Sequence, residues 1–340
     1  MASLVAAFAA VFAMTAAPGA AAIGWLRRLG ARQNISVDAP TAHALKQGTP
    51  TMGGLMFLVP FTIAVGVIIA VASPRGLEPG ALPVFMMTLA FAVIGFLDDF
   101  LSARRGKNLG LTAPQKFLAQ ALVAIGFVLW LARTGEAGST LVQLLPAAGG
   151  HPPLIVDLAW SYYPLAALFI VGLSNATNIT DGLDGLLSGQ SILICVVAAA
   201  LVGLAHPHLS LLVVALAGGL AGFLWWNAHP ARVFMGDTGS LPIGAALAGV
   251  ALAAKQEVGI IVASLVCWVE LISVIVQVLV FKWRKRTRGI EYAKANRVLK
   301  RAPLHHHFEE LGVPETAIVT RFWIAGALAA ALALMWGRFG

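Results

Sequence analysis

Long apolar runs separated by short polar segments dominate the chain. The runs fall near residues 2–24, 53–72, 82–97, 116–131, 154–173, 186–204, 209–226, 241–254, 258–281 and 320–336. A helix needs about 20 residues to cross the bilayer core, and shorter segments broken by Gly or Pro are tolerated where they line a buried or watery cavity. The pattern therefore predicts an all-α polytopic membrane protein of about ten transmembrane helices, a single integral membrane domain over residues 1–340.

Composition excludes the two commonest alternatives. The chain is 59% hydrophobic and 11% charged, whereas soluble domains are about 45–50% apolar and about 25% charged. Intrinsic disorder requires low hydrophobicity and is also excluded. Both cysteines, Cys195 and Cys267, lie inside apolar runs, so the sequence indicates neither a disulfide framework nor a cysteine-based metal site.

The net charge of +8 is explained by the predicted orientation of the chain in the membrane. If the spans alternate in direction, 19 of the 23 Lys and Arg residues lie in connections on one side of the membrane. The positive-inside rule assigns that side to the cytoplasm. The predicted cytoplasmic loops are about 25–52, 98–115, 174–185, 227–240 and 282–319, with both termini outside. A nucleic-acid partner is not expected, because the basic residues lie between apolar runs and form no folded basic face.

Five aspartates stand at the predicted cytoplasmic ends of spans: Asp98, Asp99, Asp181, Asp184 and Asp237. Ionisable groups this close to a bilayer are costly and mark functional sites. Helix capping is the alternative for Asp184 and Asp237. Capping explains Asp98 and Asp99 poorly, because they are predicted to lie at a helix C-terminus, where the helix dipole disfavours anions. Two adjacent carboxylates placed there need a cation or a proton.

Two polar segments lie beside these acids. The segment from Asn175 to Gly185 is dense in carboxylate, amide and hydroxyl oxygens, which suit Mg²⁺ bound through carboxylates and substrate phosphates. The segment from Val233 to Ser240 places backbone N–H groups at a helix start, where they can hold a phosphate, and Phe234 can stack on a base. A capped helix with a packed Phe234 remains the alternative for this segment.

Three further features carry possible chemistry. The glycine-rich segment from Lys46 to Gly54 lacks the residue order of a P-loop, and a simple turn entering the second span is the alternative. In the triplet of His305, His306 and His307, neighbours on a helix lie about 100° apart, so binding of phosphate by one or two of them fits better than a zinc site. Glu270, within an apolar run, is protonated, paired or exposed by a broken helix.

Together these motifs resemble the polyprenyl-phosphate hexose-1-phosphate transferase family over nearly the whole chain. The motifs that carry the resemblance are Lys46–Gly54, Asp98–Asp99, Asn175–Leu186, Asn227–Ser240, and Ala302–Glu309 with Arg321–Trp323. The His triplet in its Ala-Pro-Leu context resembles the muramoyl-pentapeptide branch more than the N-acetylglucosamine-1-phosphate transferases. The fold expected from the resemblance has its active site at the cytoplasmic face.

The resemblance implies a reaction and its components. Phospho-MurNAc-pentapeptide passes from UDP-MurNAc-pentapeptide to undecaprenyl phosphate, giving lipid I and UMP with Mg²⁺. The expected setting is the cytoplasmic (inner) membrane of a bacterium, with the enzyme in contact with the lipid bilayer and assembled as a homodimer. The same chemistry on another UDP-sugar is the nearest alternative. A transporter or cation channel is a weaker one, because the acids lie at one face and no repeat is evident.

The resemblance also assigns roles to residues. Asp98, Asp99 and Asp237 are the expected catalytic residues, with Asp98 as base or acceptor-positioning group, and Asp237 and Asp181 are the expected Mg²⁺ ligands. Substrate contacts are expected from Lys46, Thr51, Lys116, Asn175, Asn178, Asp181, Asp184, Phe234, His305, His306 and His307. Within that set, Phe234 is expected to face the uracil, and His305 and His306 are expected to contact the sugar-phosphate. The sequence departs from the family at Ser102 and Leu109, where lysines are usual, and Lys107 or Lys116 is expected to supply the missing charge.

Overall fold

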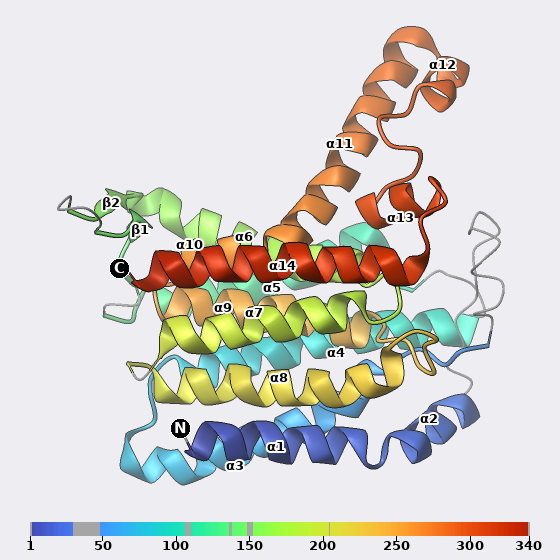
Figure 1. The fold of residues 1–340 in the computed structure, drawn as a ribbon. Coiled ribbons are helices and arrows are strands. Elements are labelled where there is room, and N and C mark those ends of the chain that lie inside the picture. Colours follow the sequence, from blue (N-terminus) through green and yellow to red (C-terminus); the bar gives the residue numbers. More distant parts are fainter. Residues whose placement is uncertain are drawn as a thin grey trace.

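A computed structural model of the chain describes residues 2–29, 48–105, 110–135, 138–147, 152–203 and 205–338. The described part is mostly helical, and its long helices lie side by side in one bundle (Figure 1). The exception is α11 (Leu265–Arg288), which leaves the bundle at an angle and carries the short α12 (Ile290–Ala295) beyond its end (Figure 1).

Six of the described helices are long and apolar enough to cross a membrane. They are α3 (Gly54–Gly76), α4 (Ala81–Arg105), α5 (Ala113–Leu131), α8 (Pro207–Asn227), α11 and α14 (Glu315–Arg338). A seventh candidate is the pair α1 (Ala2–Ala16) and α2 (Gly19–Arg28), which is bent by 47°. The expectation of a multi-pass membrane protein is confirmed, whereas ten complete crossings and the side of the termini stay predictions.

The remaining apolar runs are shorter or divided helices. Three of the predicted spans correspond to α6 (Tyr162–Thr180), α7 (Leu186–Val202) and α9 (Asp237–Ala253). The predicted span at 258–281 is interrupted at Ser264, which separates α10 (Glu257–Ala263) from α11. That break is where the chain turns out of the bundle.

The expectation of an all-α chain is wrong at one point. Strands β1 (Leu141–Leu145) and β2 (Leu154–Asp157) form an antiparallel pair in which Leu141 lies opposite Asp157. A 3₁₀ turn at Ala159–Ser161 then leads into α6. The run beginning at residue 154 was assigned to a span because short apolar runs do not distinguish strand from helix by periodicity alone.

The described helices extend into the predicted cytoplasmic loops, whose assignment to the cytoplasm stays a prediction. Helices α4 and α6 continue into the predicted loops at 98–115 and 174–185, and α9 begins inside the predicted loop at 227–240. The predicted loop at 282–319 contains the end of α11, the start of α14, and the helices α12 and α13 (Leu304–Glu309). Apolar runs mark the part of a helix in apolar surroundings, so they end before the helix does.

The core is built around α9, whose residues from Thr238 to Ala253 are all buried. Close approach of the neighbouring helices depends on glycine. A Cβ at Gly95 on α4 would overlap the carbonyl of Asp237, and one at Gly54 on α3 would overlap the backbone of Gly239. These two glycines therefore let α3 and α4 meet the N-terminus of α9, which is where the acidic residues gather.

We expect Gly95→Ala to lower the melting temperature of the purified protein, because the new methyl group meets backbone atoms that cannot rotate away. Overpacking of this kind costs about 1–3 kcal/mol. The matched control is Gly126→Ala on α5, where a Cβ meets no atom within 4 Å. There alanine is expected to stabilise the helix by roughly 0.5–1 kcal/mol. Equal melting temperatures for the two variants would contradict this account of the α4–α9 contact.

Candidate active site

Three aspartates from two helices meet at one end of the bundle. Asp98 and Asp99 lie on α4, and Asp237 is the first residue of α9. Each can offer a carboxylate oxygen within 4.8 Å of those of the other two. All three side chains are partly buried, so their negative charges repel one another with only part of the screening that water provides. The site therefore favours a bound cation.

Asp99 caps the N-terminus of α9. One oxygen accepts the backbone N–H of Thr238 at 2.9 Å and its hydroxyl at 2.6 Å, and the other accepts the N–H of Asp237 at 3.2 Å. The positive end of the α9 dipole thus offsets the charge of Asp99. The sequence argument placed both aspartates at a helix C-terminus, which is wrong, because α4 continues past them to Arg105.

Lys116 lies beside both Asp98 and Asp237. Asp98 accepts the N–H of Leu111 at 2.8 Å, while the Lys116 ammonium, on α5, lies 4.0 Å from Asp98 and directly hydrogen-bonds Asp237. Lys116 therefore brings a positive charge to the cluster, and its role as a replacement for a family lysine stays a prediction. Lys107 and Leu109 lie outside the described residues, and Ser102 lies on α4.

Asn178 and Asp181 reach the same helix terminus from α6 and the turn that follows it. The Asn178 amide donates to Asp237 at 2.6 Å and to the Ser240 hydroxyl at 2.9 Å. Asp181 accepts the N–H of Gly236, and its burial, together with the charges of Asp237 and Asp99, raises the pKa of this carboxyl well above its usual value. Asp99 and Asp181 thus hold consecutive backbone N–H groups at the start of α9.

The glycine-rich segment after Lys46 pairs with the segment before α9. Gly53 and Gly54 donate their N–H groups to the carbonyls of Phe234 and Met235 at 2.8 and 2.9 Å, and Phe234 donates to Pro50 at 2.8 Å. Thr51 lies beside Gly236, since its hydroxyl would be 3.0 Å from a Cβ at that position. This pairing places Thr51 and Phe234 next to the acidic cluster, whereas Lys46 lies outside the described residues.

Two expected substrate-binding residues are engaged elsewhere. The Asn175 amide donates to Gln120 at 2.6 Å and to the carbonyl of Val171 at 2.8 Å, which ties α6 to α5. Asp184, almost fully buried, accepts the N–H of Ala231 at 3.0 Å and pairs with His229 at 3.1 Å. With Glu315, Asp184 and His229 form a second group of potential metal ligands, apart from the three aspartates.

The three histidines do not converge, as their spacing predicts. His305 is buried and its Nδ1 lies 3.1 Å from a Glu270 oxygen. His306 hydrogen-bonds Glu309, and the Nδ1 of His307 accepts the N–H of Lys300 at 3.1 Å. The paired alternative for Glu270 is therefore the one observed. In this structure the buried ring of His305 is not available to a sugar-phosphate.

The donor set around Asp237 fits Mg²⁺. It consists of hard carboxylate oxygens from Asp98, Asp99 and Asp237, and Mg²⁺ binds proteins through one or two carboxylates while keeping waters and substrate phosphates as further ligands. Lys116 neutralises one of three negative charges, so a divalent cation is still favoured there. Asp181 lies beside this group but is not among the three whose oxygens converge.

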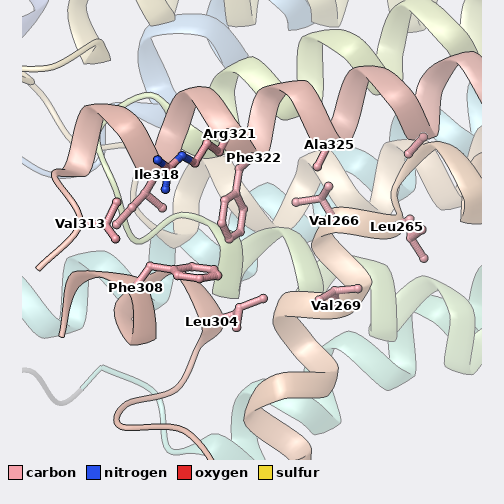
Figure 2. A pocket seen from close by; sticks show the side chains of 11 residues that line it. Leu265, Val266, Val269, Leu304, Phe308, Val313, Ile318, Arg321, Phe322 and Ala325 are labelled. Carbon is pink, nitrogen blue, oxygen red and sulfur yellow. The ribbon is translucent and has the colours of Figure 1, made fainter. Parts of the chain in front are cut away.

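An apolar cavity of about 330 Å³ lies between α11, α13 and α14. Figure 2 shows Val266 and Val269 on α11, Leu304 and Phe308 on α13, and Phe322 on α14 around it. Arg321 is its one charged lining residue and lies toward the end formed by Val313 and Ile318 (Figure 2). Such a cavity suits a hydrocarbon chain that carries an anionic group at one end.

Sequence reasoning passed over several residues that the structure brings into the site. Thr238 and Ser240 bind Asp99 and Asn178, and Gln120 binds Asn175. The spacing of Asp237, Thr238 and Ser240 around a glycine, just after a turn, is a helix-start pattern that could have identified the first two. Gln120 faces its partner only through the tertiary packing of α5 on α6, and the sequence carries no local pattern for that contact.

Comparison with known proteins connects this geometry to a chemistry. The sequence model of glycosyl transferase family 4 matches residues 81–255, and that of phospho-N-acetylmuramoyl-pentapeptide-transferase signature 1 matches residues 46–58. A phospho-N-acetylmuramoyl-pentapeptide-transferase of Halalkalibacterium halodurans is 42% identical over 92% of this chain and 90% of its own length. Proteins of the same name are 38% identical in Geobacillus kaustophilus, over 98% of this chain and 97% of theirs, and 42% identical in Picosynechococcus, over 88% and 77%.

Proposed function

The chain belongs to the phospho-N-acetylmuramoyl-pentapeptide-transferase family, and from this premise we propose how its residues perform the reaction. It is a membrane-bound transferase that moves phospho-MurNAc-pentapeptide from its UDP carrier to a polyprenyl phosphate, giving lipid I and UMP. Asp98, Asp99, Asp237 and Lys116 lie together at the N-terminus of α9. This arrangement is the main support for the roles proposed below.

Asp237 is the proposed principal Mg²⁺ ligand, with the Asp98 carboxylate beside it. A Mg²⁺ ion held by these carboxylates would supply positive charge to offset the negative charge on the donor pyrophosphate. Asn178 fixes the orientation of Asp237 through its 2.6 Å hydrogen bond. Asp181 is a second proposed ligand, because it lies in the turn beside Gly236, next to Asp237 at the start of α9.

The other cluster residues act on the acceptor and on the scaffold. Asp98 accepts the proton of the acceptor phosphate when that phosphate is protonated, or positions it for attack. Lys116, between Asp98 and Asp237, neutralises phosphate oxygens. Asp99 holds the N-terminus of α9 in place through three hydrogen bonds.

The donor, UDP-MurNAc-pentapeptide, is proposed to bind over the paired segments before α3 and α9. Phe234 provides a ring face for the uracil, while Lys46 and Thr51 face the nucleoside and phosphate. Asp184 and Asn175 support this pocket through the contacts that hold α7 and α6. His306 and His307, which are partly exposed, face the sugar-phosphate, whereas His305 is buried and acts indirectly.

The acceptor is proposed to be undecaprenyl phosphate. Its prenyl chain is apolar, which fits the cavity between α11, α13 and α14, and Arg321 carries the one charge in that lining. The proposed setting is the bacterial cytoplasmic membrane, with the site on its cytoplasmic face and the enzyme assembled as a homodimer.

The purified protein, given undecaprenyl phosphate and UDP-MurNAc-pentapeptide, should release UMP and form lipid I in equal amounts. Chelation of divalent ions should stop UMP release, and Mg²⁺ should restore it, because the acidic cluster then regains its cation. UDP-N-acetylglucosamine, assayed in parallel on one preparation, is the control donor and should yield little UMP. If UMP were released faster from UDP-N-acetylglucosamine than from UDP-MurNAc-pentapeptide, the proposed donor would be wrong, and the enzyme would use another UDP-sugar.

A further inference from the structure

Glu270 and His305 form a fully buried pair between the projecting helix α11 and the short helix α13. Both side chains have an exposed fraction of 0%. The Glu270 carboxylate lies 3.1 Å from the His305 Nδ1 and accepts the His305 backbone N–H at 3.2 Å. One carboxylate therefore fixes both the ring and the main chain of the same histidine.

The other ring nitrogen of His305 points at the turn that carries Asp181. His305 Nε2 is buried and has no hydrogen-bond partner among the described residues. It packs so closely on Gly182 that a Cβ at that position would overlap it. The neighbouring carboxylate of Asp181 accepts the N–H of Gly236, one residue before Asp237. An unbroken series of contacts thus leads from Glu270 to the start of α9.

We propose that Glu270 is a positioning residue for the transfer reaction, acting through His305 and the Asp181–Gly182 turn to fix the N-terminus of α9. This inference rests on the proposed function of Asp237. Glu270 is fully buried and contacts His305 instead of the three clustered aspartates, so its proposed role is one of placement.

The energetics of the pair argue against a merely structural role. A buried ion pair or charged hydrogen bond between two ionisable groups stabilises a fold little more than apolar residues of similar volume. The neighbours of the pair are apolar, with Val269 beside Glu270 and Leu304 beside His305, and both line the cavity of Figure 2. A valine or leucine would suffice for packing at this point. The directional contacts of Glu270 are explained by the need to orient His305.

The residues next to the Glu270–His305 pair reach both proposed substrate regions, the apolar cavity and the turn beside the acidic cluster. The cavity lies against Val269 and Leu304, and the turn with Asp181 and Gly182 lies against the ring of His305. Cys267, on the same helix as Glu270, hydrogen-bonds Thr180 at the end of α6. The segment of α11 around Glu270 therefore lines the apolar cavity through Val269 and contacts the end of α6 through Cys267.

The first test is Glu270→Gln, which keeps the shape of the side chain but replaces one of its two acceptor oxygens by a donor. Misplacement of catalytic groups costs up to about a hundredfold in rate, so we expect kcat to fall by roughly tenfold, with a several-fold rise in the Mg²⁺ concentration for half-maximal UMP release. Mn²⁺ binding by the substrate-free enzyme, followed by electron paramagnetic resonance, should weaken by a similar factor. Ile272→Ala, at an exposed position on the same helix, is the matched control and should change neither quantity.

A second test leaves Glu270 in place. Gly182 does not have a positive φ, so Gly182→Ala adds a methyl group without backbone strain and displaces the His305 ring. We expect the same loss of kcat and of Mn²⁺ affinity as in Glu270→Gln. In a His305→Ala background the space is already vacated, so Gly182→Ala and Glu270→Gln should each cause less than about a twofold further change, as expected for residues that act as one unit.

The outcomes separate the two proposals. Absence of Mg²⁺-dependent UMP release from the wild-type enzyme would overturn the proposed function of the cluster, and Mn²⁺ binding would still test the role of Glu270. Unchanged kcat and Mn²⁺ affinity in folded Glu270→Gln would overturn the positioning role. Full additivity of Glu270→Gln and His305→Ala would also overturn it, because the two residues would then act independently. If Glu270→Gln does not fold, Gly182→Ala provides the test: a loss of kcat and Mn²⁺ affinity would support the positioning role, and unchanged values would overturn it.

Discussion

Asp237→Asn should reduce UMP release by about a hundred- to a thousandfold, the loss typical of removing one group that stabilises transition-state charge. The substitution keeps the size of the side chain. Its backbone N–H still donates to Asp99, and its amide oxygen can still accept from Asn178. The fold should therefore survive, while the site loses the negative charge that holds Mg²⁺ and pairs with Lys116. The measurement is kcat at saturating Mg²⁺, with the melting temperature recorded on the same sample.

Asp157→Asn provides the matched control. Asp157 lies on β2, which sits at the end of the bundle opposite the C-terminal end of α4 (Figure 1), and it accepts hydrogen bonds from the Thr140 hydroxyl and the N–H of Ala159. Activity should stay within about twofold of wild type, since surface substitutions away from such sites have small effects. Near-normal turnover by Asp237→Asn would remove Asp237 from the proposed chemistry.

The parts of the fold that depend on local pattern could be predicted from the sequence. Apolar runs located the centres of the helices, because burial in an apolar environment selects those residues. Helix ends were misplaced, since Asp99 and Asn178 remain helical through tertiary partners that a linear pattern does not show. The β1–β2 hairpin was missed for a related reason, as its short apolar run is compatible with either structure.

The members of the candidate site could be proposed from the sequence, but their geometry could not. The motifs included Asp98, Asp99, Asn178 and Asp237, Lys116 was expected beside them, and the structure brings these five together. Their division of labour depends on which atoms meet in space. Asp184 and Asn175 carry the same chemical groups as the cluster residues, yet their partners hold other helices in place. The burial of His305 against Gly182 follows from packing that no motif encodes.

Asp98→Ala and Asp99→Ala should both abolish most activity but differ in stability, although the two residues are adjacent. Asp99 accepts three hydrogen bonds from the start of α9, and loss of a helix cap costs about 0.5–2 kcal/mol. Asp98 accepts only the N–H of Leu111 among the described backbone groups, and its other oxygen lies 4.0 Å from Lys116. Its removal also relieves repulsion with Asp237. Asp99→Ala should therefore melt clearly below wild type, and Asp98→Ala close to it.

The kinetic losses should differ in kind as well. Removing a proton-accepting group costs about 10²- to 10⁴-fold in rate, so Asp98→Ala should show a large fall in kcat in a protein of nearly normal melting temperature. For Asp99, the conservative variant Asp99→Asn retains an acceptor oxygen for Thr238 and should recover part of both stability and activity. Asp98→Asn retains the acceptor for Leu111 but cannot take a proton, so its activity should stay as low as that of Asp98→Ala. Recovery by Asp98→Asn and not by Asp99→Asn would reverse the two roles, with Asp99 acting on the acceptor and Asp98 supporting the fold.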